Sequence, residues 1–422
     1  MKKRIAFCLL GVAALLLTAA GCGSVSRKEE SADGQKEASG ALAETVQETE
    51  ENEENIENKE EDLKLVGVFL PGKAEDPRGS SIARRMETKL VEEGCQPRIF
   101  FAEEDAALQE TQIREFLESG GQVDAVVADP ADPYGLSEVL DSCTADVISY
   151  DTLIMDTLKV SCYVAFDMRQ IGKDTAREIV TRLGLETLRE EGQTRTIELL
   201  MGSPDDLEAL FFYNGVMEIL DPYLQSGTLA VPSGKISFED TAIMDLNPQV
   251  AVSHMEQILD GFYQTQRPDA ILAGDPALAL AVLPGLYEEG RYPREGETLL
   301  ATRGTEAESV KAIAEGKIDF SMFLDAYTLA DTMAKTVGTL LSGEKPENAD
   351  ASQYDNGKKI VQTVTCLAEL IDQDNYQMLV DNGYYEEEEV APEIVETPVL
   401  TEMPFSGRED DAPEISVSPG PV

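Results

Sequence analysis

LLMGSPDDLEALFFYNGVMEIL, residues Leu199 to Leu220, begins with an apolar run, breaks at Gly-Ser-Pro and continues with helical spacing of apolar residues. A strand, a tight turn and a helix in that order are the repeating unit of a doubly wound parallel sheet. A ligand often lies at the start of such a helix. The stretch therefore predicts an α/β fold and points to the turn at Gly202 to Asp206 as part of a binding site.

The same alternation of strand and helix patterns continues on both sides of this stretch. KLVGVFL at Lys64 to Leu70 is strand-like, and Ile82, Met86 and Leu90 then fall four residues apart on one helical face. The alternation restarts at Val160 and runs to Leu341. We predict two doubly wound parallel-sheet lobes rather than one very wide sheet. Because ligands bind beyond the carboxyl ends of such strands, the two lobes would share a cleft.

The N-terminus, MKKRIAFCLLGVAALLLTAAGC, has a basic start, an apolar core and small residues before Cys22. This pattern is typical of a secretory signal, which we assign to residues 1–22. Its last four residues, Ala19 to Cys22, resemble a bacterial lipobox, so we expect Cys22 to carry a lipid that holds the protein on the outer face of a membrane. A signal peptide cleaved elsewhere and an uncleaved anchor are the alternatives.

Acidic residues dominate the charge, and the formal net charge is -47. Residues 23–62 hold 14 acidic and 4 basic side chains with few large apolar residues, which predicts a disordered acidic tether. Residues 386–422, which include EEEE and several prolines, are predicted to form a disordered acidic tail. Such an excess of acid repels nucleic acid and anionic lipid headgroups, so we expect neither as a partner.

The sequence lacks the usual patterns of a metal, nucleotide or hydrolytic site. No cysteine or histidine spacing suits zinc, and we expect no cofactor. No GxSxG surrounds a serine, and the single histidine is His254, so we predict a protein that is not an enzyme. We expect Cys95, Cys143, Cys162 and Cys366 to be buried free thiols. A disulfide between Cys162 and Cys366 is the alternative.

Residues 63–385 resemble the type I solute-binding proteins of sugar ABC transporters, most closely the xylose-binding and multiple-sugar-binding branch. The resemblance is carried by eight segments in the family's order: YDTLIMD (150–156), YVAFDMRQIGKDTAREI (163–179), LLMGSPDD (199–206), LDPYLQSG (220–227), PDAILAGDPALALAVL (268–283), SVKAIAEGK (309–317), LLSGEKPE (340–347) and DNGKKIV (355–361).

The resemblance implies two lobes joined by three crossovers, with one small ligand, a sugar or polyol, captured between them. The N-terminal lobe would be residues 63–165 plus 323–357, and the C-terminal lobe 166–322 plus 358–385, with the third crossover at 360–365. The family also implies a monomer that presents its ligand to an ABC transporter permease. A binding protein that feeds a membrane sensor is one alternative, and an exported carbohydrate-active enzyme is another.

The candidate ligand-binding residues follow from the same resemblance. Asp151 and Asp275 stand where family members hold acids that bind hydroxyl groups, Arg78 stands near a first-loop arginine, and Asp206 closes the turn described above. Arg303 follows a strand end, and Phe166 and Phe323 are candidate aromatic faces; Tyr134 and Phe212 are further candidates. We expect Asp275→Ala to abolish stabilisation by ligand without unfolding the protein.

Several family positions are altered in this chain. Thr152 replaces an arginine, Leu207 and Glu208 replace a pair of asparagines, and Gly304 replaces an acid. The family's usual hydroxyl partners are therefore partly missing, although the scaffold is kept. Arg303 and Arg78 together could instead favour an acidic or phosphorylated ligand.

Overall fold

The computed structural model describes residues 63–287 and 297–392. The expected signal peptide, the expected lipid site at Cys22, the tether at 23–62 and residues 393–422 of the expected tail lie outside the described residues.

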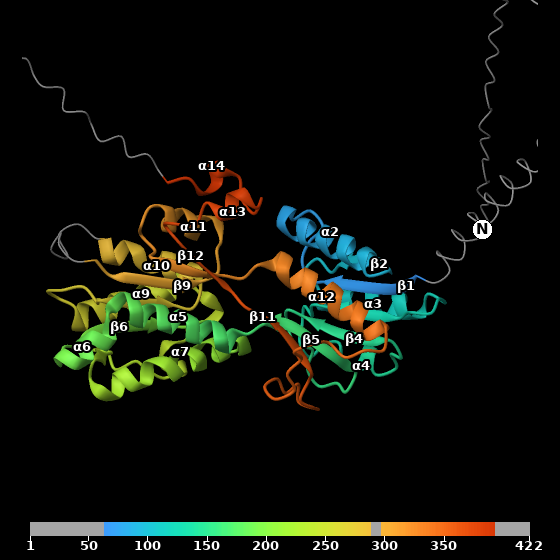
Figure 1. Ribbon diagram of the computed structural model, residues 1–422, viewed down its shortest axis with the longest axis horizontal. Coiled ribbons are helices and arrows are strands. Elements are labelled where there is room, and N and C mark those ends of the chain that lie inside the picture. The colour runs from blue at the N-terminus through green and yellow to red at the C-terminus, as the bar shows by residue number, and fades with distance from the viewer. Residues whose placement is uncertain (1–62, 288–296, 393–422) are drawn as a thin grey trace, which may run out of the picture. The chain divides into compact units, whose positions relative to one another are not determined.

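The N-terminal lobe is built on a six-stranded parallel sheet in the order β11-β5-β4-β3-β1-β2 (Figure 1). Its strands are β1 (Lys64–Leu70), β2 (Cys95–Phe101), β3 (Ala125–Ala128), β4 (Asp146–Tyr150), β5 (Val160–Phe166) and β11 (Thr363–Cys366). Its helices are α2 (Pro77–Glu92), α3 (Ala106–Glu118), α4 (Ser137–Leu140) and α12 (Ala326–Leu341).

The C-terminal lobe repeats this plan in a second six-stranded sheet, in the order β12-β10-β9-β8-β6-β7. Its strands are β6 (Arg195–Leu200), β7 (Leu229–Ala230), β8 (Ala270–Ala273), β9 (Leu299–Arg303), β10 (Phe320–Phe323) and the antiparallel β12 (Glu369–Asp372). Its helices are α5 (Met168–Leu183), α6 (Leu185–Glu191), α7 (Leu207–Ser226), α8 (Phe238–Thr241), a 3₁₀ turn (Met244–Leu246), α9 (Pro248–Phe262), α10 (Pro276–Tyr287), α11 (Ala307–Ala314), α13 (Met378–Asp381) and α14 (Glu387–Val390).

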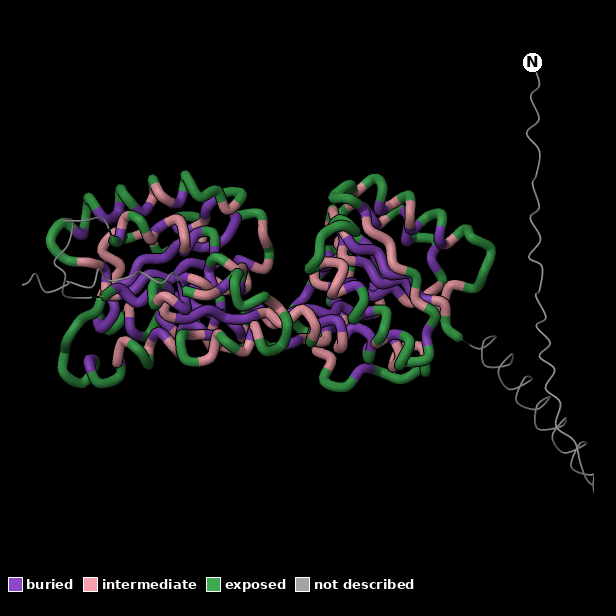
Figure 2. Tube along the Cα trace, turned by 90° about the horizontal axis from the view of Figure 1, so that it is seen from above, coloured by how far each residue is buried: buried purple, intermediate pink, exposed green. Residues whose placement is uncertain are grey.

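The prediction of two doubly wound α/β lobes is confirmed. The central strands form because short apolar runs are covered by helices, as in β3, where all four residues are buried. Figure 2 shows the buried strands inside each lobe and the exposed outer turns of the helices around them. Several helices begin where a side chain accepts a hydrogen bond from one of the first free N–H groups. Asp206, for example, accepts a hydrogen bond from the Glu208 N–H at the start of α7.

The chain passes between the sheets three times, after β5, after β10 and after β11. The expected third crossover at 360–365 is corrected by the pairing of β11 with β5, in which Thr363 lies opposite Tyr163 and Cys366 opposite Phe166. Residues 363–366 therefore belong to the N-terminal sheet, and the crossover follows Cys366. The main-chain hydrogen bonds of this parallel pair fix that assignment.

The start of the expected acidic tail is also corrected. Residues 387–390 form α14, whose Val390 is buried in the core of the C-terminal lobe. Before it, the ring of Tyr384 packs on Phe323 and stacks on Tyr327, and its hydroxyl donates to the Asp325 carboxylate at the start of α12. The folded part of the C-terminal lobe therefore extends past the expected boundary at Tyr385.

Cys95, Cys143, Cys162 and Cys366 are all free and buried, as expected. The alternative disulfide is excluded by strand register. Cys366 lies opposite Phe166, four residues along β5 from Cys162, which is about 13 Å at the usual rise per residue. A disulfide needs the two Cα atoms to lie within about 7 Å.

Two glycines allow α5 and α7 to cross in direct backbone contact. A Cβ atom added at Gly172 of α5 would collide with the carbonyl oxygen of Phe212, and one added at Gly215 of α7 would collide with that of Arg169. Because α5 and α7 begin at the binding cavity described below, their close packing also fixes the position of its C-terminal wall. No helix in the described residues has the length and apolarity needed to cross a membrane.

Candidate ligand-binding site

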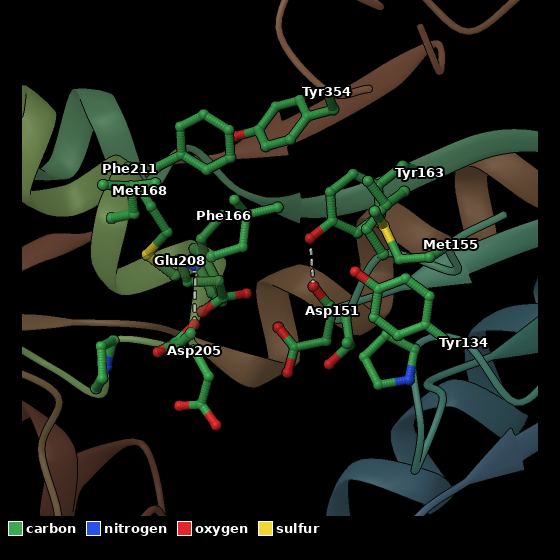
Figure 3. A pocket seen from close by; sticks show the side chains of 17 residues that line it. Tyr134, Asp151, Met155, Tyr163, Phe166, Met168, Asp205, Glu208, Phe211 and Tyr354 are labelled. Atoms are coloured by element: carbon green, nitrogen blue, oxygen red, sulfur yellow. Dashed lines mark hydrogen bonds between the residues drawn. The ribbon is translucent and has the colours of Figure 1, made fainter. Parts of the chain in front are cut away.

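A cavity of about 620 Å³ is lined by residues from both lobes (Figure 3). The N-terminal lobe contributes Pro133, Tyr134, Asp151, Thr152, Leu153, Met155, Tyr163 and Tyr354. Phe166 ends β5 at the first crossover, and Met168 with residues 204–208, Leu210 and Phe211 forms the C-terminal side. A second cavity of about 370 Å³ adjoins it and shares Asp151, Phe166, Met168 and Glu208.

The polar residues of these cavities follow the ends of parallel strands. Asp129 follows β3, Asp151 follows β4, and residues 204–208 follow β6. This is where the doubly wound fold places ligands, because the carboxyl ends of its strands meet at one edge. Asp151 has a positive φ of 59°, a conformation that aspartate adopts more readily than most residues. Its backbone oxygen accepts a 2.5 Å hydrogen bond from the Tyr163 hydroxyl, which holds the turn.

Three carboxyl groups converge where the cavities meet: Asp129, Asp151 and Glu208. Burial raises the pKa of Asp129 well above its usual value, and the neighbouring Asp151 raises it further, while hydrogen bonds with Thr152 oppose this. Burial also raises the pKa of Asp151, which the Arg303 guanidinium partly offsets. The pKa of Glu208 rises to about 8 through burial and the charge of Asp151. The site therefore disfavours further negative charge.

Arg303 lies behind this carboxyl cluster, at the end of β9. Its Nη1 is 3.9 Å from Glu208 Oε2, and its Nε donates to the Gly274 carbonyl oxygen at 3.2 Å. The guanidinium also lies over the ring of Phe212, with its carbon 5.4 Å from the ring centroid. These contacts hold Arg303 as a fixed cation of the C-terminal lobe. The carboxyl groups of Asp151 and Glu208 lie near the positive charge of Arg303. The alternative of an acidic or phosphorylated ligand, which relied on Arg303, is therefore not supported.

Aromatic rings form the apolar part of the site. Tyr354 packs edge-on against Tyr163 and Phe211, with ring centroids 5.3 Å and 5.2 Å apart. Phe166 is nearly buried and lines both cavities, whereas Tyr134 is 59% exposed at the edge of the larger one. Such faces can pack against the C–H side of a ring-shaped ligand while carboxylates accept from its hydroxyl groups.

Four of the seven expected ligand-binding residues line the two cavities. Asp151, Asp206 and Phe166 line the larger cavity, Arg78 lines the smaller one, and Arg303 lies behind both. Asp275 lines neither of these cavities; its carboxylate accepts from the Ala277 N–H and caps α10. We therefore now expect Asp275→Ala to loosen that helix start rather than to remove a direct ligand contact.

Phe323 is corrected as a ligand-facing aromatic. Its side chain is 2% exposed, packs in the core of the C-terminal lobe and meets Tyr384 edge-on. The sequence analysis names Phe323 as a candidate aromatic face because it is one of the aromatic residues that could line the cleft. The ring instead points into the lobe that β10 belongs to.

Sequence reasoning missed several residues of the site. Asp129 could have been found, since it directly follows a buried strand as Asp151 does. The family resemblance marks Glu208 only as the loss of an asparagine, although Glu208 brings a carboxyl group to the same cavity. Tyr354 lies in the irregular segment between α12 and β11, where no periodic pattern marks its direction.

Removing the Glu208 carboxyl is expected to stabilise the ligand-free protein at alkaline pH. A carboxyl whose pKa rises from 4.5 to about 8 on folding makes stability fall as pH increases through that interval. The neighbouring charges are Asp151, Asp206 and Arg303. We expect Glu208→Gln to be more stable than wild type by about 1 to 2 kcal/mol at pH 9, a discounted value for a partly exposed side chain, and by little at pH 5.

Thermal unfolding at pH 5 and pH 9 measures this difference. The exposed Glu115→Gln on α3 serves as control and should follow wild type at both values. If Glu208→Gln also follows wild type at both values, the raised pKa of Glu208 is contradicted.

The fold and the site define a two-lobed binding protein in which one cavity is lined from both sheets. The family model described as "Periplasmic binding protein domain" matches residues 66–345 of this chain. The chain belongs to this family.

The relatives with similar sequences are binding proteins too. The chain is 31% identical over 338 residues to the "Multiple sugar-binding periplasmic receptor ChvE" of Rhizobium radiobacter. The alignment covers 78% of this chain and 93% of that protein. This chain is 26% identical over 286 residues to the D-xylose-binding periplasmic protein of Escherichia coli. That alignment covers 67% of this chain and 79% of the E. coli protein.

A solved structure with a similar fold is an ABC transporter solute-binding protein from Clostridium phytofermentans with bound β-D-glucose. The two share 32% identity with a TM-score of 0.64, over 78% of this chain and 100% of that one. A solute-binding protein from Chloroflexus aurantiacus, at 24% identity and a TM-score of 0.59, has the same fold.

Proposed function

We propose that this chain is an extracytoplasmic solute-binding lipoprotein that captures a small sugar or sugar-like polyol between its lobes and delivers it to an ABC transporter permease. The observation that carries the proposal is the cavity of about 620 Å³, which both lobes line with aromatic rings and carboxylates. Its size suits one small ligand, and its residues suit the two faces of a sugar ring.

Capture between two lobes explains how binding could be reported to a partner. A ligand that contacts Asp151 from one lobe and the start of α7 from the other stabilises only arrangements in which both contacts are made. The permease would recognise that ligand-bound arrangement of a monomer. A lipid on Cys22 and the acidic residues 23–62 would tether the binding lobes near the membrane. The proposed role is binding without catalysis.

A ligand screen tests the proposal. The full chain is titrated calorimetrically and by thermal unfolding with a panel of aldoses, polyols, sugar phosphates and sugar acids. We expect at least one neutral aldose or polyol to bind and to raise Tm, because a ligand that binds only the folded state stabilises it by mass action. The sugar assignment is wrong if no aldose or polyol binds, or if the only ligands are sugar phosphates. Turnover of any glycoside in the same samples would contradict the non-catalytic role.

A further inference from the structure

The charges at the junction of the two cavities indicate a narrower class of ligand than sugars in general. This inference rests on the proposed function above. Asp129, Asp151 and Glu208 lie at this junction, and Asp205 and Asp206 line the larger cavity beside Glu208. Figure 3 shows the side chains of Asp151 and Glu208 extending toward the same part of the cavity from opposite lobes. A ligand between the lobes would therefore lie between two carboxyl groups.

The protein itself balances this negative charge only in part. Arg303 Nη1 approaches Glu208 Oε2 no closer than 3.9 Å, and the same nitrogen donates to Met168 Sδ at 3.0 Å. In the described part of the chain, the side-chain oxygens of Asp151 and Glu208 accept no hydrogen bond from a protein donor. Two carboxyl groups that line a ligand cavity therefore lack donors.

Two further cations line the smaller cavity, Lys73 in the loop after β1 and Arg78 at the start of α2. Lys73 Nζ forms an ion pair with Glu104 at 3.3 Å. The charge of Arg78 lowers the pKa of Glu306 and that of Tyr385. Among the described residues, neither Lys73 nor Arg78 forms an ion pair with the carboxyl group of Asp151 or of Glu208.

A compact metal ion does not fit this arrangement. Within residues 63–287 and 297–392, no group of three or more His, Cys, Asp and Glu side chains is placed to hold a metal ion. An ammonium group, unlike a metal ion, does not need several ligand atoms directed at one point. Its N–H donors point in different directions and can reach carboxylates on two sides. In a site shielded from water, such charge-assisted hydrogen bonds are the stronger kind.

We propose that the preferred ligand is an amino sugar or amino polyol, whose ammonium group lies between Asp151 and Glu208 while its carbon skeleton packs on the aromatic rings of the cavity. Phe166, beside both carboxyl groups, and Tyr134, at the cavity edge, would contact the C–H face of the ligand. The change from an asparagine to Glu208 would then adapt the family's pocket to a cationic ligand.

Calorimetric titration of the full chain at pH 6.5 tests this inference. The probes are D-glucose, N-acetyl-D-glucosamine, D-glucuronate and three amino-deoxy-D-glucoses with the amine at C2, C3 or C6. We expect at least one amino-deoxyglucose to bind 10-fold or more tightly than D-glucose. D-glucuronate should bind more weakly than D-glucose, because its charge has the wrong sign. N-acetyl-D-glucosamine should lose any gain in affinity that the free amine at C2 gives.

Variants separate charge from shape. Glu208→Gln keeps the size of the side chain and should remove at least 10-fold of the preference for the amine while D-glucose affinity changes less. The control Glu115→Gln, on α3, should leave the ratio of amino-sugar affinity to D-glucose affinity unchanged.

The outcomes distinguish this inference from the proposed function. If D-glucose binds as tightly as all three amines, or if Glu208→Gln keeps the preference, the amine assignment is overturned while sugar capture stands. Tightest binding by D-glucuronate, or calorimetric binding of CaCl₂ at the same site, also overturns it. If no sugar of this panel or of the wider screen binds, both proposals fall.

Discussion

Gly215→Ala is expected to destabilise the protein by about 3 kcal/mol, at the upper end of what overpacking usually costs. The added methyl group would collide with the carbonyl oxygen of Arg169 on α5, and a backbone atom cannot move away as a flexible side chain can. The two helices would have to separate. Gly172 makes the reciprocal contact with the Phe212 carbonyl oxygen, so moving the helices apart would also loosen the packing at Gly172.

The matched control is Gly261→Ala near the end of α9. A Cβ atom there meets nothing within 4 Å, so alanine should leave stability unchanged or raise it slightly through its better helix propensity. Urea unfolding of both variants measures the difference. Equal stability of Gly215→Ala and Gly261→Ala would show that the α5 and α7 contact is not tight.

Asp151→Asn is expected to weaken binding of the tightest sugar in the screen by about 50-fold. Hydrogen bonds to a charged group contribute about 1.5 to 3 kcal/mol, and each 1.4 kcal/mol is a factor of ten in affinity. Asparagine keeps the size of the side chain and tolerates the positive φ of 59°. The substitution therefore removes the charge while the turn after β4 is preserved.

Asp156→Asn is the matched control for this change. Asp156 also has a positive φ, of 57°, but it is exposed, pairs with Lys358 at the surface at 3.7 Å and does not line the cavity. Calorimetry should give wild-type affinity for Asp156→Asn. Wild-type affinity for Asp151→Asn, in a protein with unchanged thermal unfolding, would remove Asp151 from the binding site.

Much of the fold was predictable because its signals are local. Apolar strands covered on both faces, such as Ala125–Ala128, and helices with apolar residues on one face recur in order along the chain. The pairing of Thr363–Cys366 with β5 was not predictable, since a four-residue strand has no periodicity strong enough to fix its partner. The helix at Glu387–Val390 was hidden by its acidic composition, and only Val390 joins the core.

The site was predictable where it depends on strand ends and not where it depends on tertiary contacts. Asp151 and Asp206 follow strands and were expected in the cleft, which is where the structure places them. The approach of Arg303 to Glu208 joins the end of β9 to the start of α7, which lie far apart in the sequence, so no residue spacing indicates it. Phe323 shows the reverse, because strand position alone does not say which side of a crossover a ring will face.

The central claim is that both lobes bind one small ligand in the cavity at Asp151 and Glu208. A crystal structure of the full chain, grown with the tightest-binding sugar or amino sugar of the panels, tests it most directly. We expect the ligand between Phe166 and Tyr134, with polar groups within about 3 Å of Asp151 from one lobe and of Glu208 from the other. A ligand bound outside this cavity, or one that contacts a single lobe, would contradict the claim.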